Sequence, residues 1–482
     1  MEKDKNDPST TSAAFDWMYP KWKLINTLLG GTEEMREAGE EYLPRHAEET
    51  NDGYDERLQA AVLYNLTDQT INTLVGKPFS EGLKLGEDVP EKIVNEILPD
   101  VDLQGNNLEI FCKNWFEDGL SKAFSHVLID FPRPQPRNDG LPRTVADDLA
   151  AKLRPYWIHI KPESVIFARS ETINGQEVLT HVRIMEEECE MEGFCEVYKQ
   201  RIRVLEPGKV TIYVPVENKG KVVWVLEDEW LTGISYIPMV TFYANRKGLM
   251  LGKPPLLDLA YLNVAHWQSS SDQRHILTVS RFPILACSGA SEEDSSPIVV
   301  GPNKVLYNPD PSGRFYYVEH TGSAIAAGRE DLKDLEDQMS TYGAEFLKKK
   351  PGGQTATARA LDSAEASSDL GSMVRAFEDA VAQALDITAE WLKLKVPGGT
   401  IQLTREFDLQ QNEAPGLDTL VKARAARDIS RDVFLESLRL RDILPEDFDT
   451  ELNQEQLLEE TTSLLGEAQV NLDVTQTPPT NP

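Results

Sequence analysis

Several signals that would assign this 482-residue chain to a common class are missing. Its four cysteines have no C-x-x-C spacing, so neither a disulfide framework nor a zinc site is indicated, and a reducing cytoplasm fits. No stretch reaches about 18 consecutive apolar residues, and the N-terminus has no apolar core. The sequence therefore predicts a protein that is neither secreted nor membrane-spanning.

Motifs of nucleotide and acyl chemistry are absent as well. The chain has no G-x-x-x-x-G-K-[ST] motif, so the run Gly352-Gly353-Gln354-Thr355 is not a phosphate-binding loop. No G-x-S-x-G motif occurs either. We therefore expect the chain to bind neither a nucleotide nor a cofactor. A function that requires ATP hydrolysis would need a partner protein to carry it out.

Two side-chain groups invite a catalytic or metal hypothesis. His266 and His275 lie on one expected helix with Asp272, but the nine-residue separation of the histidines turns them to different faces, so we expect no metal site. Glu187 and Glu190 flank Cys189 in what we interpret as a solvent-exposed turn. General acid–base chemistry is disfavoured there, and we expect no catalytic residue.

Positive charge is scarce. Lysine and arginine number 49 against 80 aspartates and glutamates, which gives a net charge of −31. This balance argues against a sequence-reading DNA binder, which carries a basic face. It is compatible with a channel in which DNA slides, because each lysine held on a phosphate strengthens binding. Charge alone suits an ordinary acidic protein equally well.

The stretch from Gly252 to Leu392 organises the chain. A first helix is expected over 254–280, since Pro254 and Pro255 suit a first turn. It is apolar almost all round up to Trp267 and polar beyond, so one end should be buried and the other should project. Short β-type runs over 283–319 follow. They are too small to bury a large core alone, and we expect partner strands from other subunits.

A second helix should pack along one line only. Its apolar residues are spaced by three and four, as in a heptad seam, at Leu332, Leu335, Met339, Tyr342 and Phe346. The remaining positions are mostly acidic or polar, and they face water or copies of the same helix. Lys348, Lys349 and Lys350 follow, and Pro351 with two glycines then breaks the helix. A third helix from about Ala358 has apolar residues at a 3.6-residue period from Leu370 to Leu392.

The rest of the chain gives an α+β class. Met1–Asp16 is polar and expected to be disordered, and Trp17, Tyr19 and Trp22 should dock on the body. The other expected elements are helices over 54–75 and 107–124, a strand over 126–131, an antiparallel β unit over 156–245, a strand over 401–403, and helices over 416–426 and 430–439, the last capped by Ser430. The tail 442–482 contains no lysine or arginine and should be frayed.

Four segments resemble the portal proteins of tailed bacteriophages, in a siphophage and podophage branch long catalogued only as a domain of unknown function. They are 252–272, 281–285, 318–325 and 355–358. The resemblance covers about Gly30 to Glu460. It implies an N-terminal arm (1–29), a β-rich wing (30–253), a first stem helix (254–280), a small α/β clip (281–328), a second stem helix (329–346), a tunnel loop (347–357), a spine helix (358–395), C-terminal wing or crown helices (396–460) and a disordered acidic tail (461–482).

The resemblance implies a function without chemistry of its own. Such portals are homo-oligomeric rings of twelve subunits at one capsid vertex, through which double-stranded DNA enters and leaves without being read. The implied partners are the terminase large subunit, a head-completion or adaptor protein, scaffold and major capsid protein, with no membrane. The implied location is the virion, and the host cytoplasm during assembly.

It also implies particular residues. The DNA-facing tunnel loop would comprise Lys348, Lys349, Lys350, Gly352, Gly353, Gln354 and Thr355. The channel wall would include Asp331, Asp334 and Asp337, and terminase or adaptor would dock on the clip at Asn303, Lys304, Asp310 and Arg314. Two alternatives stay open: a phage-encoded enzyme with a cryptic hydrolytic site in the β-rich region, and a membrane-associated pore.

Overall fold

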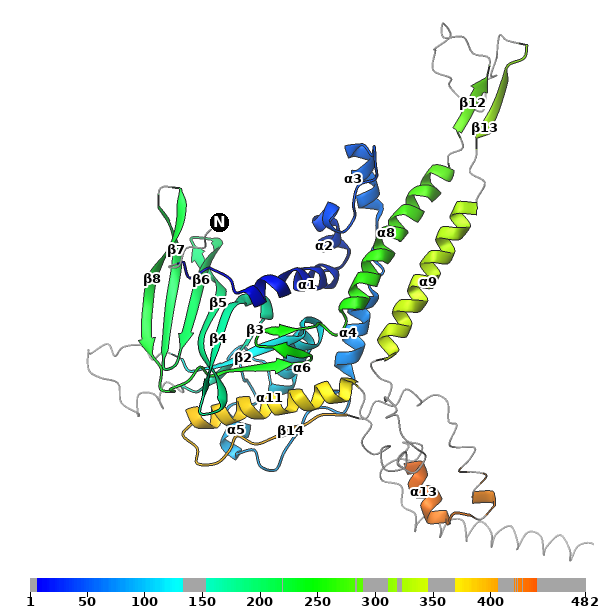
Figure 1. Cartoon of the computed structure of the whole chain (residues 1–482). Coiled ribbons are helices and arrows are strands. Elements are labelled where there is room, and N and C mark those ends of the chain that lie inside the picture. The colour runs from blue at the N-terminus through cyan, green and yellow to red at the C-terminus, as the bar shows by residue number, and fades with distance from the viewer. Residues whose placement is uncertain are drawn as a thin grey trace, which may run out of the picture. The chain divides into compact units, whose positions relative to one another are not determined.

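The computed structural model describes residues 7–132, 153–218, 220–281, 284–288, 311–318, 323–345, 369–405 and parts of 420–439. The chain forms two compact units, Met1–Phe407 and Asp408–Pro482. Helices and strands are mixed along the first unit, so the class is α+β, as the sequence predicts (Figure 1).

The last four residues of the stretch predicted to be disordered, 13–16, are helical, while 1–6 lie outside the described residues. Helix α1 (Ala13–Leu29) begins after Ser12, whose hydroxyl accepts a hydrogen bond from the backbone N–H of Phe15. The prediction failed because this cap and the burial of Trp22 stabilise a helix in a polar stretch. Of the three aromatic residues expected to dock, only Trp22 is buried, and its indole N–H donates to the Lys122 carbonyl at 2.9 Å.

The single helix expected over 54–75 is two helices, α3 (Asn51–Ala60) and α4 (Leu66–Gly76), after the short α2 (Gly31–Ala38). Asn65 causes the break. Its side-chain oxygen caps α4 by accepting from the Asp68 N–H at 3.1 Å, and its amide donates to the Leu28 carbonyl at 2.6 Å. A contact with α1 therefore overrides a continuous apolar pattern.

The body contains a three-stranded antiparallel sheet in the order β3 (Tyr156–Ile160), β2 (Phe124–Asp130), β9 (Met239–Tyr243). Helix α6 (Leu108–Lys122) leads into β2 through Ala123, whose φ of 82° ends the helix in the left-handed region. Both predicted elements, the helix over 107–124 and the strand after it, are confirmed within a few residues.

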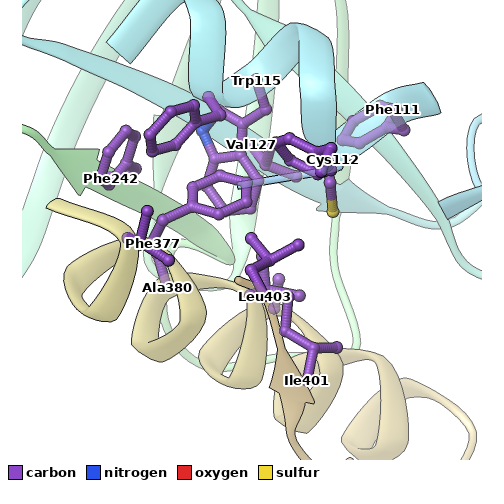
Figure 2. Close-up of a cluster of buried hydrophobic side chains, with 14 of the residues drawn as sticks. Phe111, Cys112, Trp115, Val127, Phe242, Phe377, Ala380, Ile401 and Leu403 are labelled. Atoms are coloured by element: carbon purple, nitrogen blue, oxygen red, sulfur yellow. The ribbon is translucent and has the colours of Figure 1, made fainter. Parts of the chain in front are cut away.

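Helix α11 (Asp369–Trp391) packs on this sheet and on α6, and Figure 2 shows the core between them. The Phe377 ring lies 5.1, 5.2 and 5.0 Å from the ring centroids of Trp115, Phe116 and Phe242. The predicted 3.6-residue period is confirmed from Leu370 to Thr388. The short strand β14 (Ile401–Gln402) pairs with β1 (Lys84–Leu85), so the strand predicted at 401 is present, and α5 (Glu91–Glu96) follows β1.

The single antiparallel unit predicted over 156–245 is divided between two sheets, because β3 and β9 at its ends pair with β2. Its middle is a five-stranded antiparallel sheet of β4 (Val165–Ile173), β5 (Gln176–Glu192), β6 (Cys195–Glu206), β7 (Lys209–Asn218) and β8 (Lys221–Leu231), in that order. Its buried face includes Val182, Ile184 and Leu205, which share a core with Trp22. Pairing of β6 with β7 stops at Ile202–Tyr213, whereas each outer hairpin continues to its own turn. The sheet is therefore forked at that end.

Short elements complete the first unit: η1 (Gly39–Glu41), η2 (Pro162–Ser164) and the β10 (Arg246–Gly248)–β11 (Leu251–Gly252) pair. The stem-like elements α8, β12, β13 and α9 are described below. In the second unit, α13 (Arg431–Arg439) begins after Ser430, whose hydroxyl accepts from the Val433 N–H at 3.3 Å, which confirms the predicted cap. The tail 442–482 lies outside the described residues.

Candidate functional site

The candidate site is a helical hairpin formed by α8 (Leu257–Ser280) and α9 (Ser323–Glu345), which lie side by side in Figure 1. Helix α8 starts at Leu257, later than predicted, because the two prolines form a turn in which the Leu257 N–H bonds the Pro254 carbonyl at 3.1 Å. Leu259, Ala260 and Trp267 are fully buried in the body. The predicted buried end of this helix is confirmed.

The body holds α8 through a buried amide. Asn263 is fully buried, and its oxygen accepts from the backbone N–H and the hydroxyl of Thr67, at 3.0 and 2.9 Å. Its nitrogen donates to the Tyr64 carbonyl at 2.9 Å. The Asn263 side chain is thus hydrogen-bonded to α4 and to the loop before it. These buried contacts fix the rotation of α8 about its own axis.

The polar end of α8 runs away from the body as predicted, but it is covered on two sides (Figure 1). Gln273 and Ser271 are buried, because α9 covers one side and the segment before α3 approaches another. Gln273 donates to the Ile325 carbonyl at 2.9 Å, Ser269 donates to Asp331 at 2.6 Å, and His266 Nε2 lies 3.3 Å from Glu336. These three contacts run in order along an antiparallel pair of helices.

The seam predicted on α9 is confirmed over its described part. Met339 is fully buried, and Leu332, Leu335 and Tyr342 are partly buried. The Tyr342 hydroxyl lies 3.3 Å from the Asp258 carboxylate at the foot of α8. Phe346 lies outside the described residues. A groove of about 420 Å³ beside the seam is lined by Leu262, Asp337, Gln338, Thr341 and Tyr342.

The three aspartates predicted for a channel wall are all exposed on α9, but they do not form one set. Asp334 and Asp337 lie on the side away from the seam. Asp331 instead accepts the Ser269 hydroxyl and faces α8. Glu330, which the sequence analysis did not single out, shares the exposed side with Asp334, because four positions separate the two residues.

A two-stranded hairpin joins the helices along the chain. Strand β12 (Ile284–Ser288) follows α8, and β13 (Arg314–Val318) precedes α9, with Ile284 opposite Val318 and Ser288 opposite Arg314. Tyr316 and Tyr317 are exposed by more than half of their surface. Within the described residues this sheet has two strands, so the prediction that other subunits add strands stays a prediction.

The remaining predicted site residues have different outcomes. Arg314 is exposed on β13, and its backbone N–H donates to the Ser288 hydroxyl at 3.3 Å. Asn303, Lys304 and Asp310 lie outside the described residues, as does the whole predicted tunnel loop: Lys348, Lys349, Lys350, Gly352, Gly353, Gln354 and Thr355. Their roles stay predictions.

One tie between body and hairpin was missed by the sequence analysis. Arg57 is buried on α3 and makes a bidentate pair with Glu49, with both N–O distances at 2.8 Å. The hydrogen bond from Arg57 lowers the pKa of Glu49 to about 2. The third nitrogen of Arg57, Nη1, lies 3.7 Å from Asp272 on α8, which His46 also contacts at 3.1 Å. No sequence pattern signals this cluster, because its members are brought together only by tertiary folding.

The histidines and aspartate considered for a metal therefore have separate partners. His266 faces Glu336 on α9, whereas Asp272 faces Arg57 and His46. Across the described ranges no group of three His, Cys, Asp or Glu side chains could hold a metal ion. None of the helices described is both long and apolar enough to cross a membrane.

The acidic pair beside Cys189 is not in a turn, contrary to the prediction. Glu187 and Glu190 lie on strand β5, where alternation puts them on opposite faces. Glu190 pairs with Lys199 at 2.5 Å. Residues 182–192 of β5 pair continuously with β6. This pairing extends the strand through a polar sequence that we interpreted as a turn.

A cavity of about 610 Å³ lies over the exposed face of the five-stranded sheet. The segment before α1 forms one wall, since Arg183 donates to the Pro8 carbonyl at 2.9 Å and to the Thr10 hydroxyl at 3.0 Å. His181 Nδ1 lies 3.4 Å from Glu206, and burial lowers the pKa of His181. His181 and Glu206 are among the titratable side chains that line this cavity.

Comparison with known proteins gives three findings. Residues 255–392 match a family described as a domain of unknown function (DUF4055). No curated protein matches the chain. Solved structures similar to the chain include the virion of a native gene transfer agent (GTA) particle, at 11% identity and a TM-score of 0.35, over 79% of this chain and 90% of that one.

Two structures of the neck of such a particle are also similar. The neck of the empty particle, computed with C6 symmetry, has 11% identity and a TM-score of 0.36. The neck of the native particle, computed with C12 symmetry, has 10% identity and a TM-score of 0.34. Both likenesses again cover 79% of this chain and 90% of the other. The matched family span runs from the foot of α8 to the end of α11, so it contains the whole hairpin.

Proposed function

We propose that this chain is a portal protein of a tailed-phage-like particle. Copies form a ring at one vertex of the capsid, and double-stranded DNA passes through its centre during packaging and ejection. The sequence resemblance supplies this function class, and the order of elements from α8 to α11 agrees with it: helix, β-hairpin, antiparallel helix, then a long helix across the body.

The observation that carries the proposal is the one-sided burial of α9. Its seam residues pack on α8, while Asp334 and Asp337, two of the aspartates predicted for a channel wall, are exposed on α9. A helix of this kind lacks apolar surface for a second contact within its own chain. Copies arranged round a hole would give that acidic side a use, because a wall of carboxylates repels DNA phosphate and lets it slide.

The proposed partners follow from the resemblance. The terminase large subunit and a head-completion or adaptor protein would dock on the clip, near Arg314 on β13 and Asn303, Lys304 and Asp310. Scaffold and major capsid protein would contact the wing. The ring would have twelve subunits, would be located in the virion after assembly in the host cytoplasm, and would carry out no reaction itself.

The direct test is to image the purified full chain by electron microscopy and to measure its mass in solution. Rings with a central hole, and a mass close to a whole multiple of the 54.1 kDa chain, are expected. A compact monomer at high concentration would contradict the proposal. A monomer that hydrolyses an ester or glycoside substrate, with activity lost on His181→Ala, would instead support the enzyme alternative.

A further inference from the structure

The helical hairpin has charged side chains that its own chain does not use. Within the seam, polar contacts join Ser269 to Asp331 and Gln273 to Ile325. Arg274 follows Gln273 by one position, about 100° round the helix, and so points away from α9. It is exposed, and in the described part of the chain no ion pair includes it.

Arg274 belongs to a basic stripe on α8. Thr278 and Arg281 follow at spacings of four and three, so the three side chains share one side of the helix. Both arginines are exposed, and the Thr278 hydroxyl bonds only back to the Arg274 carbonyl at 2.9 Å. Below this stripe the same side of α8 packs on the body through Asn263 and Trp267. The basic stripe is therefore the part of that side that the body leaves open.

The exposed side of α9 has the opposite sign. Glu330, Asp334 and Asp337 repeat the spacings of four and three, and no described residue forms an ion pair with any of them. Exposed Arg329 and Lys333 lie along one edge of this acidic stripe, and Lys333 is three positions from Glu330 and four from Asp337. The hairpin thus has a basic stripe on α8 and a mainly acidic stripe on α9.

The seam contacts fix the height of each charge along the hairpin. Asp331 lies level with Ser269, so Glu330 lies level with about residue 270, four positions or about 6 Å below Arg274. Glu336 lies level with His266, so Asp334, two positions nearer the tip, lies level with about residue 268, six positions or about 9 Å below Arg274. An extended arginine side chain spans the first distance but not the second. Glu330 is the carboxylate matched to Arg274.

A closed ring of more than two copies uses two different surfaces of each subunit, one against each neighbour. A hairpin with opposite charges on two sides is complementary to the next copy in such a ring. Complementarity matters in this chain, because a net charge of −31 makes copies repel one another elsewhere.

We propose that Arg274 of each chain pairs with Glu330 of the next chain round the ring, so that this contact sets the direction of assembly. The inference rests on the proposed ring and adds its contact residues. The partner at both sites is a second copy of this chain.

Charge reversal in the full-length chain tests the pair. The variants are Arg274→Glu, Glu330→Arg and the double variant, and the mass distribution is measured by sedimentation velocity across protein concentrations at low salt. Each single reversal should raise the concentration for half-maximal ring formation about fivefold or more, since attraction becomes repulsion at every interface. The double variant should return to within roughly twofold of the unchanged chain, because its reversed charges still face each other.

Matched controls reverse exposed charges on α5, with Lys92→Glu and Glu96→Arg. These variants should assemble as the unchanged chain does. Circular dichroism and thermal unfolding of all variants should agree, because each altered side chain is exposed. The difference between the single variants and the unchanged chain should shrink at about 0.5 M salt, where screening shortens the reach of the charges.

The outcomes separate this inference from the proposed function. Rings that form equally well with either single reversal, or a double variant worse than both singles, would overturn the pair and leave the ring intact. An unchanged chain that stays monomeric throughout would overturn both. Rescue by the double variant alone would support both.

Discussion

A single hydroxyl shows how α11 is held in place. Thr388 is fully buried on α11, and its Oγ1 accepts the Trp157 indole N–H at 2.9 Å and donates to the Ala384 carbonyl at 2.8 Å. The apolar period of the sequence places Thr388 in the core. It gives no sign that the hydroxyl is the partner of a tryptophan on β3.

Replacing Thr388 with Val should destabilise the first unit by about 1–3 kcal/mol, because the buried indole N–H loses its acceptor while the volume is kept. Thr388→Ser retains the hydroxyl and should cost less, about 1 kcal/mol, for the lost methyl group. Denaturant unfolding followed by tryptophan fluorescence measures both. Equal stability of the Val variant and the unchanged chain would show that the bond contributes nothing.

The buried pair of Glu49 and Arg57 predicts a dependence on pH. The folded-state pKa of Glu49, about 2, lies below its usual value of 4.5, so its stabilising contribution is complete above about pH 4.5 and is lost as the pH falls toward 2. Glu49→Gln removes that contribution. Its unfolding free energy should therefore lie below that of the unchanged chain at pH 6 and approach it near pH 2.

Thermal unfolding of both chains across this range measures the difference. Glu40→Gln is the control, since Glu40 pairs with Arg45 at 2.5 Å on the exposed surface and such pairs contribute little. A difference between Glu49→Gln and the unchanged chain that stays constant with pH would contradict the assignment.

At the scale of elements, amphipathic helices could be predicted and local breaks could not. The periods of α9 and α11 are one-dimensional patterns, so the seam through Met339 and the core face through Phe377 follow from spacing alone. Asn65 breaks the apolar pattern by bonding to Leu28 on α1, and an apolar period contains no information about such a distant contact. The strand at Glu187 was missed for the same reason, because pairing with β6 outweighs its polar sequence. The cap at Ser12 is local, like the one predicted at Ser430, and could have been found from the sequence.

The seam predicts a second element-scale result. Met339 is the fully buried residue of α9, so Met339→Ala should weaken the contact of α9 with α8 and the body by about 2–3 kcal/mol. Backbone amides of α9 should then exchange hydrogen faster by roughly tenfold or more, while those of α11 should change little. Gln338→Ala, at an exposed neighbouring position, is the control. Uniform acceleration through both helices would show that the hairpin and body open together.

At the scale of the whole molecule, the function class is a prediction from the resemblance, and part of the proposed site lies among the described residues. Asp334, Asp337 and Arg314 are exposed where the proposal requires access. The side-chain environment of Asp331 could not be predicted, because exposed and seam positions are adjacent on α9 and only the register with Ser269 decides between them. Arg57 could not be found either, since an arginine that pairs within a fold reads as an ordinary surface charge.

The lysines before the glycine run give the whole-molecule prediction. Changing Lys348, Lys349 and Lys350 to Ser should leave ring formation unchanged and lower the DNA retained per particle, because a ring of lysines at a narrow point would contact passing phosphates without reading sequence. DNA content of purified particles measures the effect, with Lys92→Ser as the control. Normal DNA content with all three lysines replaced would refute a role in the channel.

The antiparallel pairing of α8 with α9 has one more consequence, for length. Contacts join the two helices at several levels: Asp258 with Tyr342 near the body, then Ser269 with Asp331, and Gln273 with Ile325 farther out. Removing equal numbers of residues from α8 and α9 beyond the Gln273–Ile325 contact would shorten the hairpin without disturbing the contacts nearer the body. Removing residues from one helix alone would tilt the β12–β13 pair at its far end. Paired insertions in the two helices would therefore change the distance from the body to the far end of the hairpin, while the contacts between the helices below the insertion stay the same.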